Sequence, residues 1–330
     1  MRSRREFLQR GLTLAGAAGA ALAGLPSTTA SAQAPAGSVR RSDRYDDSFI
    51  FERKAFRWPG NATLAIWIAP NVEVWRYDSP GGQAISPNER SVVPDVVNYA
   101  WREYGMRVGL WRLADVLDAA GVRATVALNS AVIEAHPKAV DEMKRRRWEF
   151  MGHGITNTEN LAGLPLEKER ALIQAALKTI EQATGSRPRG WLGPGLTETY
   201  NTLDLLAEEG VIYCSDWNSD DQPYPMKVRM GVMFSIPYCM EINDIPLFIR
   251  KGYTGEQYLQ SLVDQFDTLY ADSAKQPRVL GIPLHPMITG QPLRSRYLDK
   301  ALAHMKSRER VWFATGSEII DAYRRATAAP

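Results

Sequence analysis

Cysteine and histidine are scarce in this 330-residue sequence, which has two cysteines and four histidines. Two cysteines cannot form a disulfide scaffold, and no CxxC pair or Cys/His cluster indicates a structural zinc site. Cys214 and Cys239 each fall in an apolar, strand-like run. We therefore expect two buried thiols rather than a bridge between them.

A large excess of charge is also lacking, because the formal net charge is +3. Much of the positive excess lies in residues 1–41, where six arginines accompany the single acid Glu6. The rest of the chain is close to neutral. We therefore expect neither nucleic acid nor an anionic membrane surface as a partner.

Three catalytic or binding motifs are missing from the chain. No GxGxxG follows a predicted strand, no GxSxG frames a serine, and neither cysteine lies beside a histidine. These absences argue against dinucleotide binding and against covalent catalysis by serine or cysteine.

No apolar run is long enough for a stable membrane span, and the run at 12–25 is rich in Ala and Gly. It follows the segment SRREFL at 3–8, which resembles a twin-arginine export signal. Small residues up to Ala32 suit a cleavage site. We predict a signal peptide over 1–34, recognition by the twin-arginine export machinery, a periplasmic or secreted location, and a mature chain without a membrane span.

Strand and helix patterns alternate after a polar linker at 35–46, which predicts one domain over 47–330. Such alternation favours a parallel α/β barrel, with a doubly wound open sheet as the alternative. A long loop over 77–90, rich in Gly, Pro, Ser and Asn, is predicted to cap the ends of the strands. The expected strands are 62–69, 124–128, 148–151, 190–192, 211–214, 234–238, 279–284 and 311–314, and the expected helices are 110–117, 138–146, 167–183, 201–209, 256–269 and 297–305.

Polar side chains recur directly after these strands, and in a barrel they would face one rim. They are Asn71, Glu73, His153, Asn157, Asp216, Asp220, Asp221, Asn243, Asp244 and His285. Carboxylates that activate water and histidines that donate protons indicate hydrolysis. Each residue alone is equally compatible with a structural role.

Other residues are weaker candidates for contact with a substrate. Aromatic walls are predicted from Trp75, Trp191 and Trp217, which could equally belong to the core. Arg107, Arg112 or Arg294 would clamp an anionic or ureide substrate, and a structural salt bridge is an equal alternative for Arg107 and Arg294. For Glu159 and Glu241 a surface or capping role is the stronger expectation, and His136 and His304 are interpreted as structural.

The order of short motifs resembles the polysaccharide deacetylase superfamily (NodB homology, carbohydrate esterase 4) over about residues 62–323. The motifs are Gly-His-Gly at 152–154, Gly-Trp-Leu-Gly-Pro-Gly at 190–195, Ser-Asp-Trp at 215–217 and Leu-His-Pro at 284–286. The resemblance implies a distorted (β/α)7 barrel and hydrolysis of non-peptide C–N amide bonds. The chain is most similar to the allantoinase-like branch, through Tyr-Gly-Met-Arg-Val-Gly at 104–109, Asp-Asp-Gln-Pro-Tyr at 220–224, Asn-Asp at 243–244 and Gly-Gln-Pro-Leu-Arg at 290–294.

Two substitutions set the chain apart from typical members of that superfamily. Their Thr-Phe-Asp-Asp-Gly motif is replaced by Asn71-Val72-Glu73, and their His-x-x-x-His metal pair becomes His153 and Asn157. Asn71 cannot accept a proton from water. A set of Glu73, His153 and Asn157 would bind zinc weakly, because an amide oxygen is a poorer ligand than imidazole. The allantoinase-like branch is similarly altered, which implies that activity requires no metal, or only a weakly bound divalent one.

The sequence thus predicts an exported hydrolase of non-peptide amide bonds, acting on an N-acetyl group, a linear amide or a cyclic ureide of a small molecule or sugar. Glu73 would activate water, His153 and Asn157 would bind the amide oxygen or a weak metal, and His285 would protonate the leaving nitrogen. Asp216 would orient one of the histidines. The alternative is a non-catalytic binding protein on a degenerate deacetylase scaffold. The sequence leaves the oligomeric state open, including a homo-oligomer.

Overall fold

Strand β1 (Leu64–Val72) is the longest strand among the described residues, and all nine of its residues are buried. Its apolar run LAIWIA is typical of a parallel strand covered on both faces. The computed structural model describes residues 42–79, 84–85 and 93–328. The predicted signal peptide, most of the linker and most of the predicted loop over 77–90 lie outside these residues.

Among the described residues, nine strands form one curled sheet in the order β6-β7-β5-β4-β3-β2-β1-β8, with β9 also paired to β1. Every pairing is parallel except that of β6 with β7. Beyond β1 the strands are β2 (Thr125–Leu128), β3 (Glu149–Gly152), β4 (Gly190–Trp191), β5 (Tyr213–Cys214), β6 (Tyr224–Met226), β7 (Met233–Ser235), β8 (Arg278–Leu284) and β9 (Val311–Phe313). This half-barrel confirms the predicted distorted barrel and disagrees with a flat doubly wound sheet.

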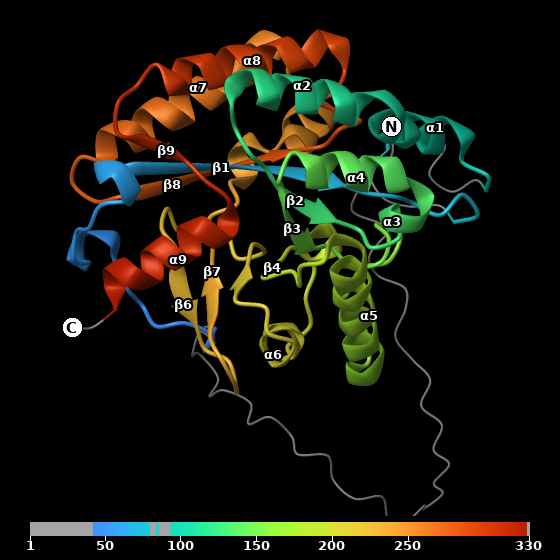
Figure 1. Ribbon diagram of the computed structural model, residues 1–330, viewed down its shortest axis with the longest axis horizontal. Helices are drawn as coiled ribbons and strands as arrows, with labels where there is room; N and C mark the ends of the chain where they lie inside the picture. The colour runs from blue at the N-terminus through green and yellow to red at the C-terminus, as the bar shows by residue number, and fades with distance from the viewer. Residues whose placement is uncertain (1–41, 80–83, 86–92, 329–330) are drawn as a thin grey trace, which may run out of the picture. The chain divides into compact units, whose positions relative to one another are not determined.

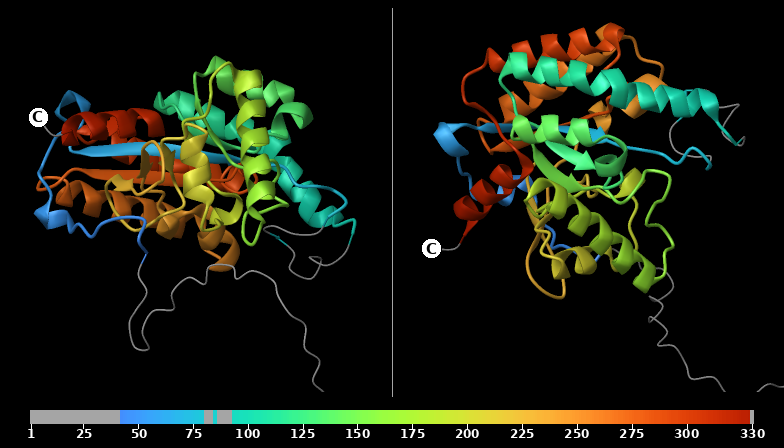
Figure 2. Two further views of the ribbon diagram at one scale, coloured as in Figure 1. Left: turned by 90° about the horizontal axis from the view of Figure 1, so that it is seen from below. Right: turned by 45° about the vertical axis from the view of Figure 1, so that its right-hand side comes forward.

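Helices pack against the outside of the curled sheet (Figures 1 and 2). Helices α2, α7 and α8 pack together beside β8, whereas α5 and α6 lie on the other side, next to β3. The α-helices are α1 (Val96–Tyr104), α2 (Leu110–Ala120), α3 (Val132–Ala135), α4 (Pro137–Arg145), α5 (Leu166–Thr184), α6 (Thr202–Glu208), α7 (Gly255–Asp272), α8 (Pro292–Lys306) and α9 (Gly316–Thr327).

Short helical turns join several of these elements. They are η1 (Ile50–Glu52), η2 (Pro59–Asn61), η4 (Gly105–Gly109), η5 (Pro194–Leu196), η6 (Met240–Ile242) and η7 (Ile245–Arg250). The sequence patterns did not predict α1, α9 or β6. Within the described part of the chain, no helix has the length and apolar character that crossing a membrane requires.

The side chains of β1 alternate between two apolar layers. Leu64, Ile66 and Ile68 belong to the layer under the helices, whereas Ala65, Trp67 and Ala69 belong to a second cluster with β3, β5 and β7. Successive residues of a strand point to opposite faces, so Asn71 and Glu73 continue on the face of Ala69. The alternation therefore directs Glu73 into the interior of the half-barrel at the end of β1.

The two cysteines are free thiols. Cys214 is buried, as predicted, and burial raises the pKa of its thiol well above the ordinary value. Cys239 is only partly buried.

Candidate active site

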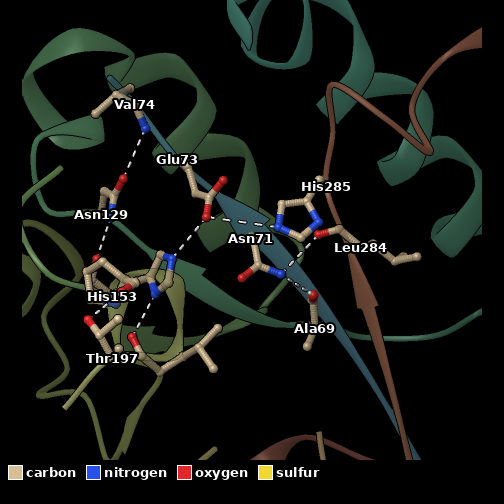
Figure 3. A network of polar contacts seen from close by, with 12 residues as sticks. Ala69, Asn71, Glu73, Val74, Asn129, His153, Thr197, Leu284 and His285 are labelled. Atoms are coloured by element: carbon tan, nitrogen blue, oxygen red, sulfur yellow. Dashed lines mark hydrogen bonds and ion pairs between the residues drawn. The ribbon is translucent and has the colours of Figure 1, made fainter. Parts of the chain in front are cut away.

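Glu73 occupies the centre of a buried polar network at the carboxyl ends of β1, β3 and β8 (Figure 3). Glu73 is buried, with 6% of its surface exposed. The Oε1 atom lies 3.0 Å from Nε2 of His153 and 4.0 Å from Nε2 of His285. Two histidines from strands on either side of β1 thus point at one carboxylate oxygen.

His153 follows β3 and is fixed by the neighbouring β4 segment. Its Nδ1 lies 2.6 Å from the carbonyl oxygen of Leu192, which can only accept a hydrogen bond. The Nδ1 atom is therefore the donor, and Nε2 is the atom directed at Glu73. In a neutral ring Nε2 would then be an acceptor, and a carboxylate oxygen is an acceptor too. A proton or a cation is therefore needed between these two atoms, which lie 3.0 Å apart.

The backbone around His153 is held by Asn129, which directly follows β2. Its Nδ2 donates to the carbonyl oxygen of His153, and its Oδ1 accepts from the backbone N–H of Val74 at 3.0 Å. Gly154 has φ +67°, and a Cβ there would lie 2.6 Å from Cγ of Pro194. This turn therefore requires glycine after the histidine.

His285 follows β8 and is oriented by Asp244, which is fully buried. Asp244 Oδ1 accepts from Nδ1 of His285 at 2.6 Å. Its Oδ2 accepts from the backbone N–H of His285 at 2.8 Å and from the hydroxyl of Thr289 at 2.6 Å. Burial lowers the pKa of His285, but the charge and hydrogen bond of Asp244 and the charge of Glu73 outweigh it, and the pKa is raised. The protonated imidazole is favoured, with Nε2–H directed toward Glu73.

Four buried polar atoms on the two segments that carry Glu73 and His153 have no hydrogen-bond partner among the described residues. They are Oε2 of Glu73, Nε1 of Trp75, Oγ1 of Thr156 and Oδ1 of Asn157. Buried polar groups in proteins are nearly always paired. Because the 156–158 segment bonds to Val74 and Arg76, these two segments offer donors and acceptors that a polar ligand or water would satisfy.

Asn71 forms the floor of the site instead of an open substrate contact. Its Nδ2 donates to Tyr238 Oη at 2.9 Å and to the carbonyl oxygens of Ala69 and Leu284 at 3.2 Å each. The side chain is 2% exposed and ties β1 to β8. The amide group of Asn71, which the sequence analysis assigned to substrate binding, therefore bonds to other groups of the protein.

Asp216 orients a backbone turn and not a histidine, which differs from the prediction. Its carboxylate accepts from the backbone N–H of Gly193 at 2.9 Å and lies 3.4 Å from the Cys214 thiol. Burial and the charge of Glu198 raise its pKa well above the ordinary value. Asp244 performs the orienting role expected of Asp216.

The predicted aromatic walls take different positions. Trp191 is fully buried in the core beside α5, so it cannot form an open substrate wall. Trp217 is half-buried and donates to Oε1 of Glu198 at 2.9 Å.

Asp220 and Asp221 lie far from Glu73. Asp220 pairs with Arg53 at 2.5 Å, and Asp221 lies 3.5 Å from Arg278. The carbonyl oxygen of Asp221 accepts from Val279, six residues before His285 on the same strand, a separation of about 20 Å. Neither carboxylate can contact a substrate at Glu73.

Asn243 also has a local structural role, since its Oδ1 accepts from the N–H of Ile245 at 2.9 Å. Asn243 caps the turn that carries Asp244. Of the two predicted substrate contacts, Asn243 is therefore a cap, and Asp244 is the partner of His285.

The predicted arginines lie around the mouth of the half-barrel. Arg107 is exposed on η4, whose Gly109 packs against Pro286 after His285. Arg112 donates to Tyr104 Oη at 2.9 Å and to the carbonyl oxygen of Gly290. Arg294 lies 4.4 Å from the ring centre of Phe248, and burial lowers its pKa despite the charge of Asp244. Arg112 is thus structural.

The minor candidates lie on the surface or in surface pairs. Glu159 is exposed and 3.7 Å from Arg76, and Glu241 is exposed within η6. His136 is 3.8 Å from Glu103, and His304 is 2.9 Å from Asp267.

Three contributors to the site were not predicted: Asn129, Thr289 and Arg102. Asn129 directly follows a predicted strand, so the rule that identified Glu73 and His153 would have found it. Arg102 belongs to α1, which the sequence patterns did not reveal. Its guanidinium lies 4.8 Å from the ring centre of Trp75.

The residues near Glu73 fit a divalent metal only in part. Glu73, His153 and Asn157 would hold it, and the unpartnered oxygens of Glu73 and Asn157 are suitable donors. The amide in place of a second imidazole makes that set weak. A different group, Glu198, Cys214 and Asp216, has ligand atoms within 4.8 Å of one another among the described residues. Burial raises the pKa of each of these groups, which disfavours the charged forms that bind metals.

Comparison with known proteins identifies similar sequences and similar structures. The family model of polysaccharide deacetylases matches residues 103–214. A Schizosaccharomyces pombe protein named "Putative polysaccharide deacetylase" is 26% identical over 298 residues, covering 81% of this chain and 92% of that protein.

Two crystal structures are similar over most of the chain. A "probable Polysaccharide deacetylase" of Pseudomonas aeruginosa has 27% identity and a TM-score of 0.78, covering 87% of this chain and 100% of that one. Puue allantoinase has 26% identity and a TM-score of 0.75, covering 87% and 99%. Together these matches support the polysaccharide deacetylase family and a hydrolase of C–N bonds other than peptide bonds.

Proposed function

We propose that this chain, a hydrolase of non-peptide C–N bonds with the polysaccharide deacetylase fold, cleaves an amide of a small molecule or sugar with water activated by Glu73. The observation that carries the proposal is one buried carboxylate facing two histidines, one of which a second buried carboxylate orients.

Glu73 would act as the general base. His153 holds its Oε1, which leaves the buried and unpartnered Oε2 to accept a hydrogen bond from water. As the water oxygen bonds to the amide carbon, its proton passes to Glu73 and the C=O electron pair moves onto oxygen. A positioned carboxylate of this kind contributes a factor of about 10²–10⁴ to the rate.

His285 would act as the general acid. Asp244 favours its protonated form, and Nε2 lies 4.0 Å from Oε1 of Glu73. The proton on Nε2 passes to the leaving nitrogen as the C–N bond breaks, giving an amine and a carboxylic acid. Without that proton the nitrogen would leave as a strongly basic anion.

A divalent metal, if one binds at Glu73, His153 and Asn157, would supply Lewis-acid polarisation of the amide oxygen. The two proton transfers described above need only side chains of this chain.

The substrate class proposed here includes N-acetyl groups, linear amides and cyclic ureides. Similarity to structures named as a polysaccharide deacetylase and an allantoinase supports both ends of this range. The twin-arginine pattern at 3–8 supports export to the periplasm or the exterior, which favours a substrate of the cell envelope or the environment.

An amide panel tests the function directly. The panel contains N-acetylglucosamine oligomers, linear amides and hydantoin-type cyclic ureides, and acetate, ammonia and ring opening are measured. We expect wild-type turnover of one class and loss of that turnover in Glu73→Gln. Tight binding of a panel member without hydrolysis, retained in Glu73→Gln, would instead support the non-catalytic binding protein.

A further inference from the structure

The chain stays extended past the end of β1, from Val72 to Arg76. The carbonyl of Val72 accepts from Asn129, both backbone groups of Val74 bond to Asn129 and Asn157, and the N–H of Arg76 donates to Thr158. All these backbone groups belong to even-numbered residues, the alternation of an extended strand. Trp75 lies two residues beyond Glu73, about 6.6 Å further along the chain, and belongs to the apolar layer that also holds Val72 and Val74.

The indole of Trp75 carries an unused hydrogen-bond donor. The residue is 7% exposed, and its ring packs in the apolar layer beneath α1. The Nε1 atom is buried and has no hydrogen-bond partner among the described residues. An indole N–H can only donate, so an acceptor is the one kind of group that would satisfy it.

The surroundings of Trp75 favour an acceptor that carries negative charge. The Arg102 guanidinium lies 4.8 Å from the centre of the Trp75 ring. Arg102 is also close enough to Glu73 to interact with its charge. Thr156 and Asn157, also with unpartnered polar atoms, are tied by their segment to Val74 and Arg76. Arg102 thus lies against the indole and close enough to feel the charge of the carboxylate that would activate water.

We propose that the Nε1–H of Trp75 donates a hydrogen bond to the amide oxygen of the substrate and stabilises the oxyanion of the tetrahedral intermediate. This inference rests on the proposed hydrolase function. When water adds, the C=O electron pair moves to the oxygen that faces the indole. When the C–N bond breaks, the pair returns to form the carbonyl, and the nitrogen leaves with the proton of His285.

Replacement of Trp75 by phenylalanine removes the N–H and keeps an aromatic ring. Because the donor acts on the transition state more than on the bound amide, we expect kcat to fall roughly 10²-fold with a small change in KM. Trp148→Phe is the matched control. Trp148 is also buried in the apolar layer but precedes β3, at the opposite end of that strand from His153, so kcat should be unchanged.

A nuclear magnetic resonance measurement gives a readout that does not depend on turnover or on the folding of Trp75→Phe. In Glu73→Gln protein with the amide that wild-type enzyme hydrolyses best, the assigned indole proton of Trp75 should move downfield at saturation, and that of Trp148 should not.

The outcomes separate the two proposals. If wild-type protein hydrolyses a panel amide but the Trp75 proton stays in place at saturation, or Trp75→Phe keeps wild-type kcat, the oxyanion role is wrong and the proposed function stands. If wild-type protein hydrolyses no panel amide, both proposals fail.

Discussion

Replacement of Asp244 by asparagine tests how the chain prepares His285 as an acid. Asp244 is fully buried and accepts three hydrogen bonds, two from His285 and one from Thr289. Asparagine has nearly the same shape but no charge, and its NH₂ group would face a donor in at least one of these contacts. The variant therefore removes the interaction that favours protonated His285.

The expected losses of activity and stability in Asp244→Asn follow from these three hydrogen bonds. A hydrogen bond to a charged group contributes about 1.5–3 kcal/mol. A loss of about 2–4 kcal/mol of transition-state stabilisation corresponds to a fall in kcat of roughly 30–1000-fold. The same replacement should lower the free energy of unfolding by about 2–4 kcal/mol, because buried donors lose an acceptor.

The pH profile has a definite direction. His285 acts in its protonated form, and its raised pKa keeps that form populated to higher pH than an ordinary histidine. Removal of the Asp244 charge lowers the pKa of His285, so the basic limb of kcat should move to lower pH.

The assay is the hydrolysis of the best panel amide from pH 5 to 10, with thermal unfolding alongside. Asp267→Asn is the control, because Asp267 pairs with His304 at 2.9 Å on the surface. It should leave kcat and the pH profile unchanged. An Asp244→Asn enzyme with wild-type kcat and an unmoved basic limb would refute the assignment of His285 as the acid.

Three further predictions concern positions around this centre. Gly109→Ala would overlap the carbonyl oxygen of Pro286, so we expect a lower melting temperature in calorimetry and a reduced kcat, because the turn after His285 must shift. Asp220→Asn should lower the free energy of unfolding by about 1–3 kcal/mol through its partly buried pair with Arg53, with kcat unchanged because the site is about 20 Å away; a denaturant titration and an activity assay check both. Dialysis against EDTA should leave kcat nearly unchanged, since Asn157 replaces an imidazole in the metal set, and stoichiometric zinc by elemental analysis together with lost activity would contradict this.

The longest strand and the position of Glu73 at its end could be predicted because both depend on local patterns. An unbroken apolar run indicates a strand buried on both faces, and the observed β1 covers Leu64–Val72 against the predicted 62–69. Alternation then places Glu73 in the interior. The ends of parallel strands meet at one edge, which is why His153 and His285 could be assigned to the same site.

The partners of the histidines could not be predicted, because they depend on the path of the chain after each strand. Asp216 and Asp244 both follow a strand, yet only Asp244 reaches His285, through η6 and a turn capped by Asn243. Asp220 and Asp221 follow the same strand as Asp216, but that segment crosses to the beginning of β8. Spacing in the sequence carries no information about this crossing.

Helix α1 was missed because its apolar positions do not form a buried stripe. Val96 and Val97 are exposed, whereas Asn98 and Arg102 are buried. A pattern that equates burial with apolar residues cannot recognise such a helix. Because α1 was not predicted, Arg102, the cation beside Trp75, was not identified either.

The activation of water by Glu73 can be tested most directly with isotopically labelled water. Wild-type protein and Glu73→Gln are incubated with the best panel amide in H₂¹⁸O, and the carboxylic acid product is examined by mass spectrometry. We predict that wild-type protein places one ¹⁸O in the new carboxyl group and that Glu73→Gln forms product at least roughly 10²-fold more slowly. Equal rates of ¹⁸O incorporation by both proteins would contradict the claim that Glu73 activates water.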